Sequence, residues 1–133
     1  ARAFSQDTNF KIEKNMRQLV EGICESFGVS AEVKYETTCP VTFNQAKQAE
    51  AATKAAITLL GDDKCDGDID PRPFSEDFSI MSDNTPGCFV LMGNGTSGSY
   101  GRPLHSADYD FNDELLVKGS SYWVELAEQQ LQT

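Results

Sequence analysis

The spacing of apolar residues near the start of the chain predicts a long α-helix. Between residues 8 and 28, apolar side chains recur every three or four positions, which is the period of one helix face. Asp7, Thr8 or Asn9 can cap the start of this helix, and Gly28 suits the left-handed position after its end. The apolar face would consist of Ile12, Met16, Leu19, Val20, Ile23 and Phe27.

Segments on both sides of this helix have the pattern of β-strands. Residues 1–5 read as a strand that the sequence enters partway, with no turn or cap before it. From residue 31 to residue 36, apolar and polar residues alternate, as they do in a strand with one buried face. The pattern predicts a β-α-β unit that ends near Pro40, and such a unit needs further strands to be stable.

Three more helices are predicted in the rest of the chain. Residues 45–60 are rich in alanine and other helix formers, so we expect a helix that packs through small side chains. Residues 75–82 read as a short helix with Ser75 as its cap and two carboxylates in its first turn. A last amphipathic helix begins after Asn112 or Asp113.

One apolar run lies among these helices. Residues 88–92 have no polar interruption, which is typical of a strand covered on both faces in a parallel sheet. Helices that alternate with such a strand indicate a piece of a layered sheet. We therefore expect an α/β fold class for this part of the chain, with an α+β unit before it. Each of the two parts looks like half of a larger domain.

A long glycine-rich loop follows the apolar run and carries His105, the only histidine of the chain. Ligands of open α/β sheets gather at the carboxyl ends of the strands, so this loop is the candidate active site. Asp108 and Asp110 lie nearby, and a carboxylate commonly orients a metal-bound imidazole. A lone histidine is by default an ordinary packed or solvent-exposed residue, and it cannot build a metal site by itself. A functional role and an ordinary structural position for His105 therefore both stay open.

Composition narrows the function classes. The chain has 133 residues and 21 acidic against 11 basic residues, a net charge of −10, so a nucleic-acid or anionic-membrane surface is not expected. No apolar run approaches the roughly 20 residues that span a bilayer. Four cysteines without a CxxC pair indicate buried free thiols and a cytoplasmic protein. The sequon at Asn94 would matter only in a secretory compartment.

Two motifs match known sites in spelling only. Gly93-x-Gly95-x-x-Gly98 follows a predicted strand, but no helix start follows it to hold a pyrophosphate, and its glycines are more simply those of a mobile loop. The carboxylates from Asp66 to Asp77 alternate as in a calcium loop. Pro71 replaces the glycine that the sharp turn of such a loop requires, so a solvated acidic loop is the better interpretation.

Several short motifs occur in a fixed order along the chain: Ser75-Glu76-Asp77-Phe78-Ser79, Pro86-Gly87-Cys88-Phe89, Pro103-Leu104-His105-Ser106 and Tyr109-Asp110-Phe111-Asn112. Together they resemble the C-terminal part of the metallopeptidase-related amidohydrolases typified by hippurate hydrolase, aminoacylase-like deacylases and indoleacetyl-amino-acid hydrolases. At the start of the chain, Arg2-Ala3-Phe4 resembles the end of a strand motif of that family. The resemblance covers essentially the whole chain.

The resemblance implies the C-terminal half of a two-domain metallohydrolase. Its α/β catalytic domain would be interrupted by a smaller ferredoxin-like lid that also forms a homodimer. Residues 1–43 would be the second half of the lid, and residues 44–133 the last part of the catalytic domain.

The resemblance also assigns roles to four residues. His105 matches the last metal-ligand histidine of a pair of divalent ions, manganese or zinc, that activates water and polarises the amide. Arg2 matches an arginine near the substrate carboxylate, and Glu76 and Asp77 match a structural helix start near the site. The catalytic glutamate and the other metal ligands lie upstream in the family, so no catalytic residue is expected in this chain, and no stably bound metal.

The leading hypothesis is a fragment of an amidohydrolase that cleaves N-acyl amino acids or small peptides and is inactive by itself. Its partner would be a small-molecule N-acyl amino acid, with neither nucleic acid nor membrane. A first alternative is a non-enzymatic module that dimerises through exposed strand edges. A second alternative is a calcium-binding protein that uses the acidic loop.

Overall fold

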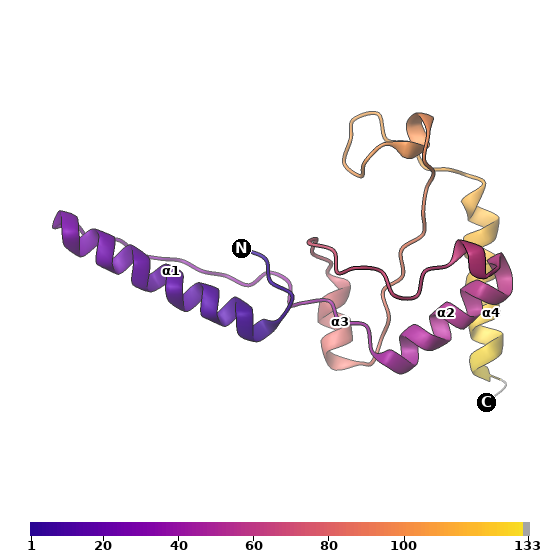
Figure 1. Ribbon diagram of the computed structural model, residues 1–133, viewed down its shortest axis with the longest axis horizontal. Coiled ribbons are helices and arrows are strands. Elements are labelled where there is room, and N and C mark those ends of the chain that lie inside the picture. Colours follow the sequence, from indigo (N-terminus) through magenta and orange to yellow (C-terminus); the bar gives the residue numbers. More distant parts are fainter. Residues whose placement is uncertain (132–133) are drawn as a thin grey trace. The chain divides into compact units, whose positions relative to one another are not determined.

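The regular structure of residues 1–131 is helical in the computed structural model that describes them (Figure 1). The chain divides into two compact units. The first unit joins Ala1–Asn44 to Ile69–Gly87, and the second joins Gln45–Asp68 to the chain from Cys88 onward. The helices are α1 (Gln6–Phe27), α2 (Ala46–Leu60), the 3-10 helix η1 (Asp62–Lys64), α3 (Phe78–Asn84), the 3-10 helix η2 (Gly98–Gly101) and α4 (Leu115–Leu131).

Helix α1 confirms the predicted amphipathic helix and corrects its start. Ser5 is the N-cap, since its hydroxyl accepts a hydrogen bond of 3.2 Å from the backbone N–H of Thr8. The predicted caps at residues 7–9 are therefore wrong, because the helix begins at Gln6. At the other end Gly28 has a φ of 66°, as predicted, and Val29 N–H donates to the Cys24 carbonyl at 3.0 Å. This is the hydrogen-bond pattern of a Schellman motif.

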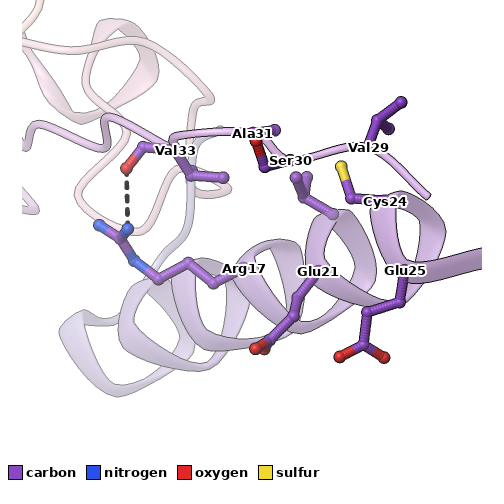
Figure 2. Close-up of a pocket in the computed structure, with 9 residues that line it drawn as sticks. Arg17, Glu21, Cys24, Glu25, Val29, Ser30, Ala31 and Val33 are labelled. Carbon is purple, nitrogen blue, oxygen red and sulfur yellow. Dashed lines mark hydrogen bonds between the residues drawn. The ribbon is translucent and has the colours of Figure 1, made fainter. Parts of the chain in front are cut away.

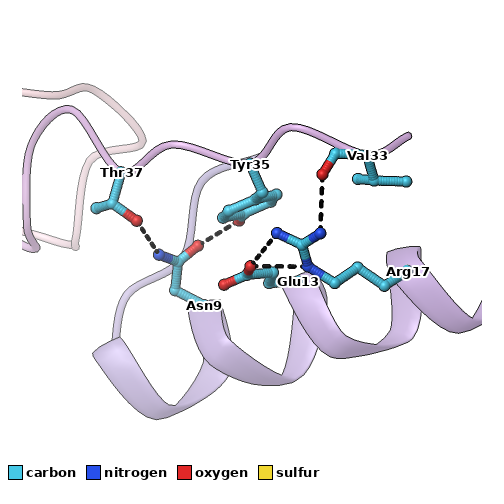
Figure 3. A network of polar contacts seen from close by, with 6 residues as sticks. All are labelled: Asn9, Glu13, Arg17, Val33, Tyr35 and Thr37. Atoms are coloured by element: carbon cyan, nitrogen blue, oxygen red, sulfur yellow. Dashed lines mark hydrogen bonds and ion pairs between the residues drawn. The ribbon is translucent and has the colours of Figure 1, made fainter.

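Polar side chains hold the segment after α1 along the helix (Figure 3). Arg17 donates to the Val33 carbonyl at 2.8 Å, and the Tyr35 hydroxyl donates to the Asn9 side-chain oxygen at 2.7 Å. Early helix residues thus meet late segment residues, so the segment runs antiparallel to α1. The Arg17 guanidinium is fixed for this contact by an ion pair with Glu13 at 2.7 Å.

The predicted strand at residues 31–36 lies in this segment but is not a strand here. A strand requires a hydrogen-bonded neighbour, and the described residues provide none for it. The apolar face of α1 is likewise uncovered, because none of its residues is buried. Among the exposed side chains of this face are Met16, Leu19, Ile23 and Phe27.

Helix α3 starts later than predicted. It begins at Phe78, and its first turn is closed by backbone bonds in which Ser79 N–H donates to the Glu76 carbonyl and Ile80 N–H donates to the Asp77 carbonyl. Ser75 therefore does not cap it, and the prediction of a helix start at that serine is wrong. The Ser79 hydroxyl, fully buried, donates to the same Glu76 carbonyl at 2.6 Å.

Helices α2 and α4 pack against each other in the second unit. As the alanine-rich sequence predicts, small side chains of α2 are buried, Ala52 and Ala55, together with Tyr122 of α4. The Tyr122 hydroxyl reaches the Ala52 carbonyl at 3.5 Å. These three are the only apolar residues among the described ones that are buried, so the core of this unit is small.

The apolar run at residues 88–92 is neither a β-strand nor buried. Val90, Leu91 and Met92 each keep about half of their surface exposed, at 47%, 51% and 46%. A run with this sequence is stable as a strand only between neighbouring strands and under helices. Residues 1–131 contain no β-strand at all, so the α/β fold class stays a prediction. The domain assignments 1–43 and 44–133 also stay predictions, since they refer to a longer protein.

Candidate functional site

Two asparagines join the ends of the loop that carries His105, which we define as residues 94–112. The side-chain amide of Asn94 donates to the carbonyls of Tyr100 at 3.1 Å and Asp110 at 2.8 Å. Its oxygen accepts from the backbone N–H of Asn112 at 2.9 Å, and the Asn112 side chain returns a bond of 3.2 Å to the Asn94 carbonyl. We call these four hydrogen bonds the asparagine clasp.

Two glycines bring the branches of the loop into direct contact. A Cβ atom on Gly101 would lie 2.6 Å from the carbonyl carbon of Thr96, and a Cβ atom on Gly95 would lie 2.8 Å from the Cβ atom of Tyr100. Gly95 also has a φ of 152°. A side chain at either position would force a shift of its neighbours, so Gly95 and Gly101 allow this close contact.

His105 occupies a strained position at a turn within this loop. Ser106 N–H donates to the Pro103 carbonyl at 3.2 Å, which closes a β-turn with His105 in its third position. The φ of His105 is 71°, and no other non-glycine residue of the described chain has a positive φ. A type II turn requires this conformation at that position and usually places glycine there. An exposed histidine in such a position is a functional candidate.

An ion pair spans the turn. Arg102 and Asp108 lie three residues on either side of His105, and their side chains meet at 2.9 Å. Both side chains are more than half exposed, so the pair adds little stability by itself. The ion pair does affect the surroundings of His105. The sequence suggests Asp108 as a carboxylate that orients the imidazole, but this carboxylate is directed to Arg102 instead.

A pair of metal ions does not fit on the described residues alone. Across residues 1–131, no three side chains of histidine, cysteine, aspartate or glutamate come close enough together to hold a metal ion. His105 supplies one imidazole, and a structural or catalytic zinc needs at least three protein ligands. Any metal at His105 therefore takes its remaining ligands from elsewhere.

The other predicted site residues lie in the first unit. The Arg2 guanidinium donates to the Pro73 carbonyl at 2.5 Å, which brings it to the segment that leads into Glu76 and Asp77. Those two residues contribute their backbone carbonyls to the start of α3, as a structural role requires. The structure thus brings Arg2 to this segment, whereas His105 belongs to the second unit.

The carboxylates of the acidic loop are not gathered into a group that could hold a metal ion. The Asp66 carboxylate accepts a hydrogen bond of 3.0 Å from the backbone N–H of Asp68, which is an Asx-turn. No cluster of three acidic side chains forms there or elsewhere in the described part of the chain.

A pocket of about 400 Å³ lies between α1 and residues 29–33 (Figure 2). Its one cation, Arg17, is already bonded to Glu13 and to the Val33 carbonyl. Glu21 and Glu25 point away from the segment in Figure 2. The pocket therefore presents no uncommitted cation to a ligand and does not compete with the His105 loop as a site.

The four cysteines are free thiols, as the sequence predicts, but each is half-buried rather than buried. Burial raises the pKa of the Cys88 thiol. Burial, and then the charge of Cys88, raise the pKa of the Tyr122 hydroxyl. Both groups stay protonated at neutral pH, so Cys88 is not an activated nucleophile. None of the described helices has the length and apolar character needed to cross a membrane.

The asparagine clasp and the turn at His105 were not anticipated from the sequence. Asn94 was considered only as the first residue of a sequon, although an asparagine between two glycines is also typical of a loop junction. The structure gives a physical reason against a glycan there, because a glycosidic bond would replace a hydrogen of an amide that already donates twice.

Comparison with known proteins places this site in a family. Residues 5–129 match the sequence model of peptidase family M20/M25/M40. The chain belongs to this family. Family membership confirms the resemblance to metallopeptidase-related amidohydrolases and makes the chain part of a hydrolase family. No solved structure gives a significant match.

Three relatives indicate the range of chemistry in the family. Hippurate hydrolase of Campylobacter jejuni is 27% identical over 126 residues, which are 95% of this chain and 32% of that protein. N-acetylcysteine deacetylase of Bacillus subtilis is 31% identical over 133 residues, 99% of this chain and 33% of that protein. Thermostable carboxypeptidase 2 of Saccharolobus solfataricus is 26% identical over 122 residues, 90% of this chain and 30% of that protein. The chain thus spans about a third of the length of these relatives.

Proposed function

We propose that the chain is the C-terminal part of a metal-dependent amidohydrolase that cleaves the amide bond of N-acyl amino acids or small peptides. The observation that carries the proposal is the match of residues 5–129 to a peptidase family, with relatives named for hippurate and N-acetylcysteine. Both compounds are amino acids with an acylated nitrogen. The remaining two thirds of such an enzyme would supply the catalytic base and the other metal ligands.

His105 is the proposed metal ligand of this chain. Its imidazole is exposed, it sits at the strained position of a turn, and the clasped loop fixes the backbone on both sides of it. A pair of manganese or zinc ions would supply the means to activate a water and to polarise the amide carbonyl. The part of this chain is to hold one neutral imidazole toward them.

Arg2 is the proposed substrate-binding residue. A guanidinium can hold a carboxylate through two parallel hydrogen bonds, and every N-acyl amino acid carries a free carboxylate. In the structure Arg2 bonds one backbone carbonyl, and a neutral acceptor of this kind is readily exchanged for a carboxylate. Glu76 and Asp77 would support this region through the start of α3.

A second candidate function rests on the uncovered face of α1. Leu19, Ile23 and Phe27 of this face are all at least half exposed, at 64%, 50% and 78%. Such a face suits an interaction module, and in the proposed enzyme it belongs to the lid that forms the homodimer.

The proposed enzyme is cytoplasmic, in keeping with free thiols.

The test is hydrolysis by the complete protein. We expect it to release the free amino acid from hippurate or N-acetylcysteine with manganese or zinc and to lose this activity with a chelator. His105→Ala should lower kcat/KM by about 100-fold or more, since a metal ligand is lost. The isolated 133-residue chain should be inactive. Metal-independent hydrolysis, or turnover by the isolated chain, would contradict the proposal.

A further inference from the structure

We infer that Asn94 is a positioning residue for His105. The inference rests on the proposed function, in which His105 binds a metal. Asn94 does not approach the imidazole. It acts through the backbone of the loop, by joining the start of the loop to Asp110 and Asn112, just before α4.

The clasp joins points that are far apart in sequence. Asn94 bonds the backbone of Tyr100, Asp110 and Asn112, six, sixteen and eighteen residues away. One side chain therefore closes both the small branch of the loop, which contains η2, and the large branch, which contains His105. Both amide hydrogens of Asn94 are used, so no shorter or apolar side chain can replace it.

The turn at His105 needs such support. A positive φ at a non-glycine residue persists only where the surrounding structure fixes it, and the exposed ion pair of Arg102 and Asp108 is a weak restraint. The clasp adds restraints at the two ends of the loop, and the contact of Gly101 with Thr96 adds one at its base. With these restraints lost, the loop would relax and His105 would leave its fixed direction.

The same geometry connects the loop to the packed helices. Asn112 accepts a bond from the backbone N–H of Glu114 at 3.1 Å, and Leu115 N–H donates to the Asn112 carbonyl at 2.9 Å. Asn112 thus starts α4 while it holds Asn94. The position of the loop is in this way tied to the helix that packs on α2.

The experiment uses the complete protein, two variants in the loop and one control variant in α1. Asn94→Ala removes the three bonds of the clasp that the Asn94 side chain makes, and Asn94→Asp keeps the oxygen for Asn112 N–H but places a carboxylate against two carbonyls. Asn15→Ala, at an exposed position of α1, is the matched control. Hydrogen exchange of residues 95–111 is measured without metal, and the manganese dissociation constant is measured by calorimetry.

We expect both Asn94 variants to speed exchange in the loop by at least about tenfold, because Asn94→Ala loses three hydrogen bonds and Asn94→Asp loses two. Exchange in α2 and α4 should stay as in the parent protein. The manganese dissociation constant should rise by about 10- to 100-fold, the usual effect of losing a residue that orients a ligand. Asn15→Ala should change neither quantity.

Two results would overturn the inference. One is unchanged exchange in the loop, and the other is faster exchange with unchanged manganese affinity. The manganese affinity of His105→Ala separates failure of this inference from failure of the proposed function. If His105→Ala leaves the affinity unchanged, the proposed function fails as well. If His105→Ala weakens manganese binding and the Asn94 variants do not, only the inference fails. If the Asn94 variants do not fold, Gly101→Ala must produce both changes through its clash with Thr96, and Gly93→Ala, which meets nothing within 4 Å, must produce neither.

Discussion

His105 combines the two properties that a ligand at a turn requires, exposure and a fixed backbone. A left-handed backbone costs a non-glycine residue about 1–2 kcal/mol, and the chain accepts this cost at no other non-glycine position between residues 1 and 131. A turn selected only for stability would carry glycine at this position. The strain is thus evidence that the imidazole itself is needed there.

A pair of substitutions tests this view of the turn. His105→Gly removes the strain, whereas His105→Ala keeps it, and both remove the imidazole. Relief of the strain is partly offset by the greater freedom of glycine in the unfolded chain, so we expect the Gly variant to be more stable than the Ala variant by about 1 kcal/mol. Urea unfolding of the metal-free complete protein measures the difference. Equal stability would mean that the turn is unstrained.

At the scale of single residues, the sequence revealed the candidate but not its setting. His105 was found because it is the only histidine and follows a glycine-rich run. Its positive φ could not be read from the sequence, since histidine is not a residue that normally marks a type II turn. The role of Asn94 depends on bonds to residues up to eighteen positions away, which no local pattern records.

At the scale of elements, helices were predictable and strands were not. The end of α1 and the bounds of α2 follow from apolar period and composition, because helical hydrogen bonds are made within the segment itself. The start of α1 was missed because Ser5 was assigned to a strand. The runs at 31–36 and 88–92 need partners from outside the segment, and no described residue supplies them.

Replacing two glycines, one within α1 and one at its end, is expected to have opposite effects on the stability of this helix. Gly28→Ala places a side chain at a φ of 66° in the Schellman motif and should destabilise the helix by about 1 kcal/mol. Gly22→Ala lies inside α1 with nothing within 4 Å of the new Cβ atom and should stabilise it by up to about 1 kcal/mol. Thermal unfolding followed by circular dichroism measures both. Effects of equal sign would show that the Schellman motif does not end the helix.

At the scale of the whole molecule, the described residues expose more apolar surface to water than a folded monomeric protein usually does. Its buried apolar residues are two alanines and Tyr122, while Trp123 on α4 is 66% exposed. Monomeric proteins rarely leave large apolar faces in water, so the faces of α1 and α4 are expected to pack against other parts of a complete enzyme. Family membership over a third of the length of the relatives agrees with this expectation.

The most direct measurement is the position of the metal in a crystal of the complete protein grown with manganese or zinc. Anomalous scattering locates the ions independently of any assumption about ligands. The account predicts an ion at about 2.1 Å from an imidazole nitrogen of His105, with its other ligands from residues outside this chain. Ions bound with His105 directed away from them would contradict it.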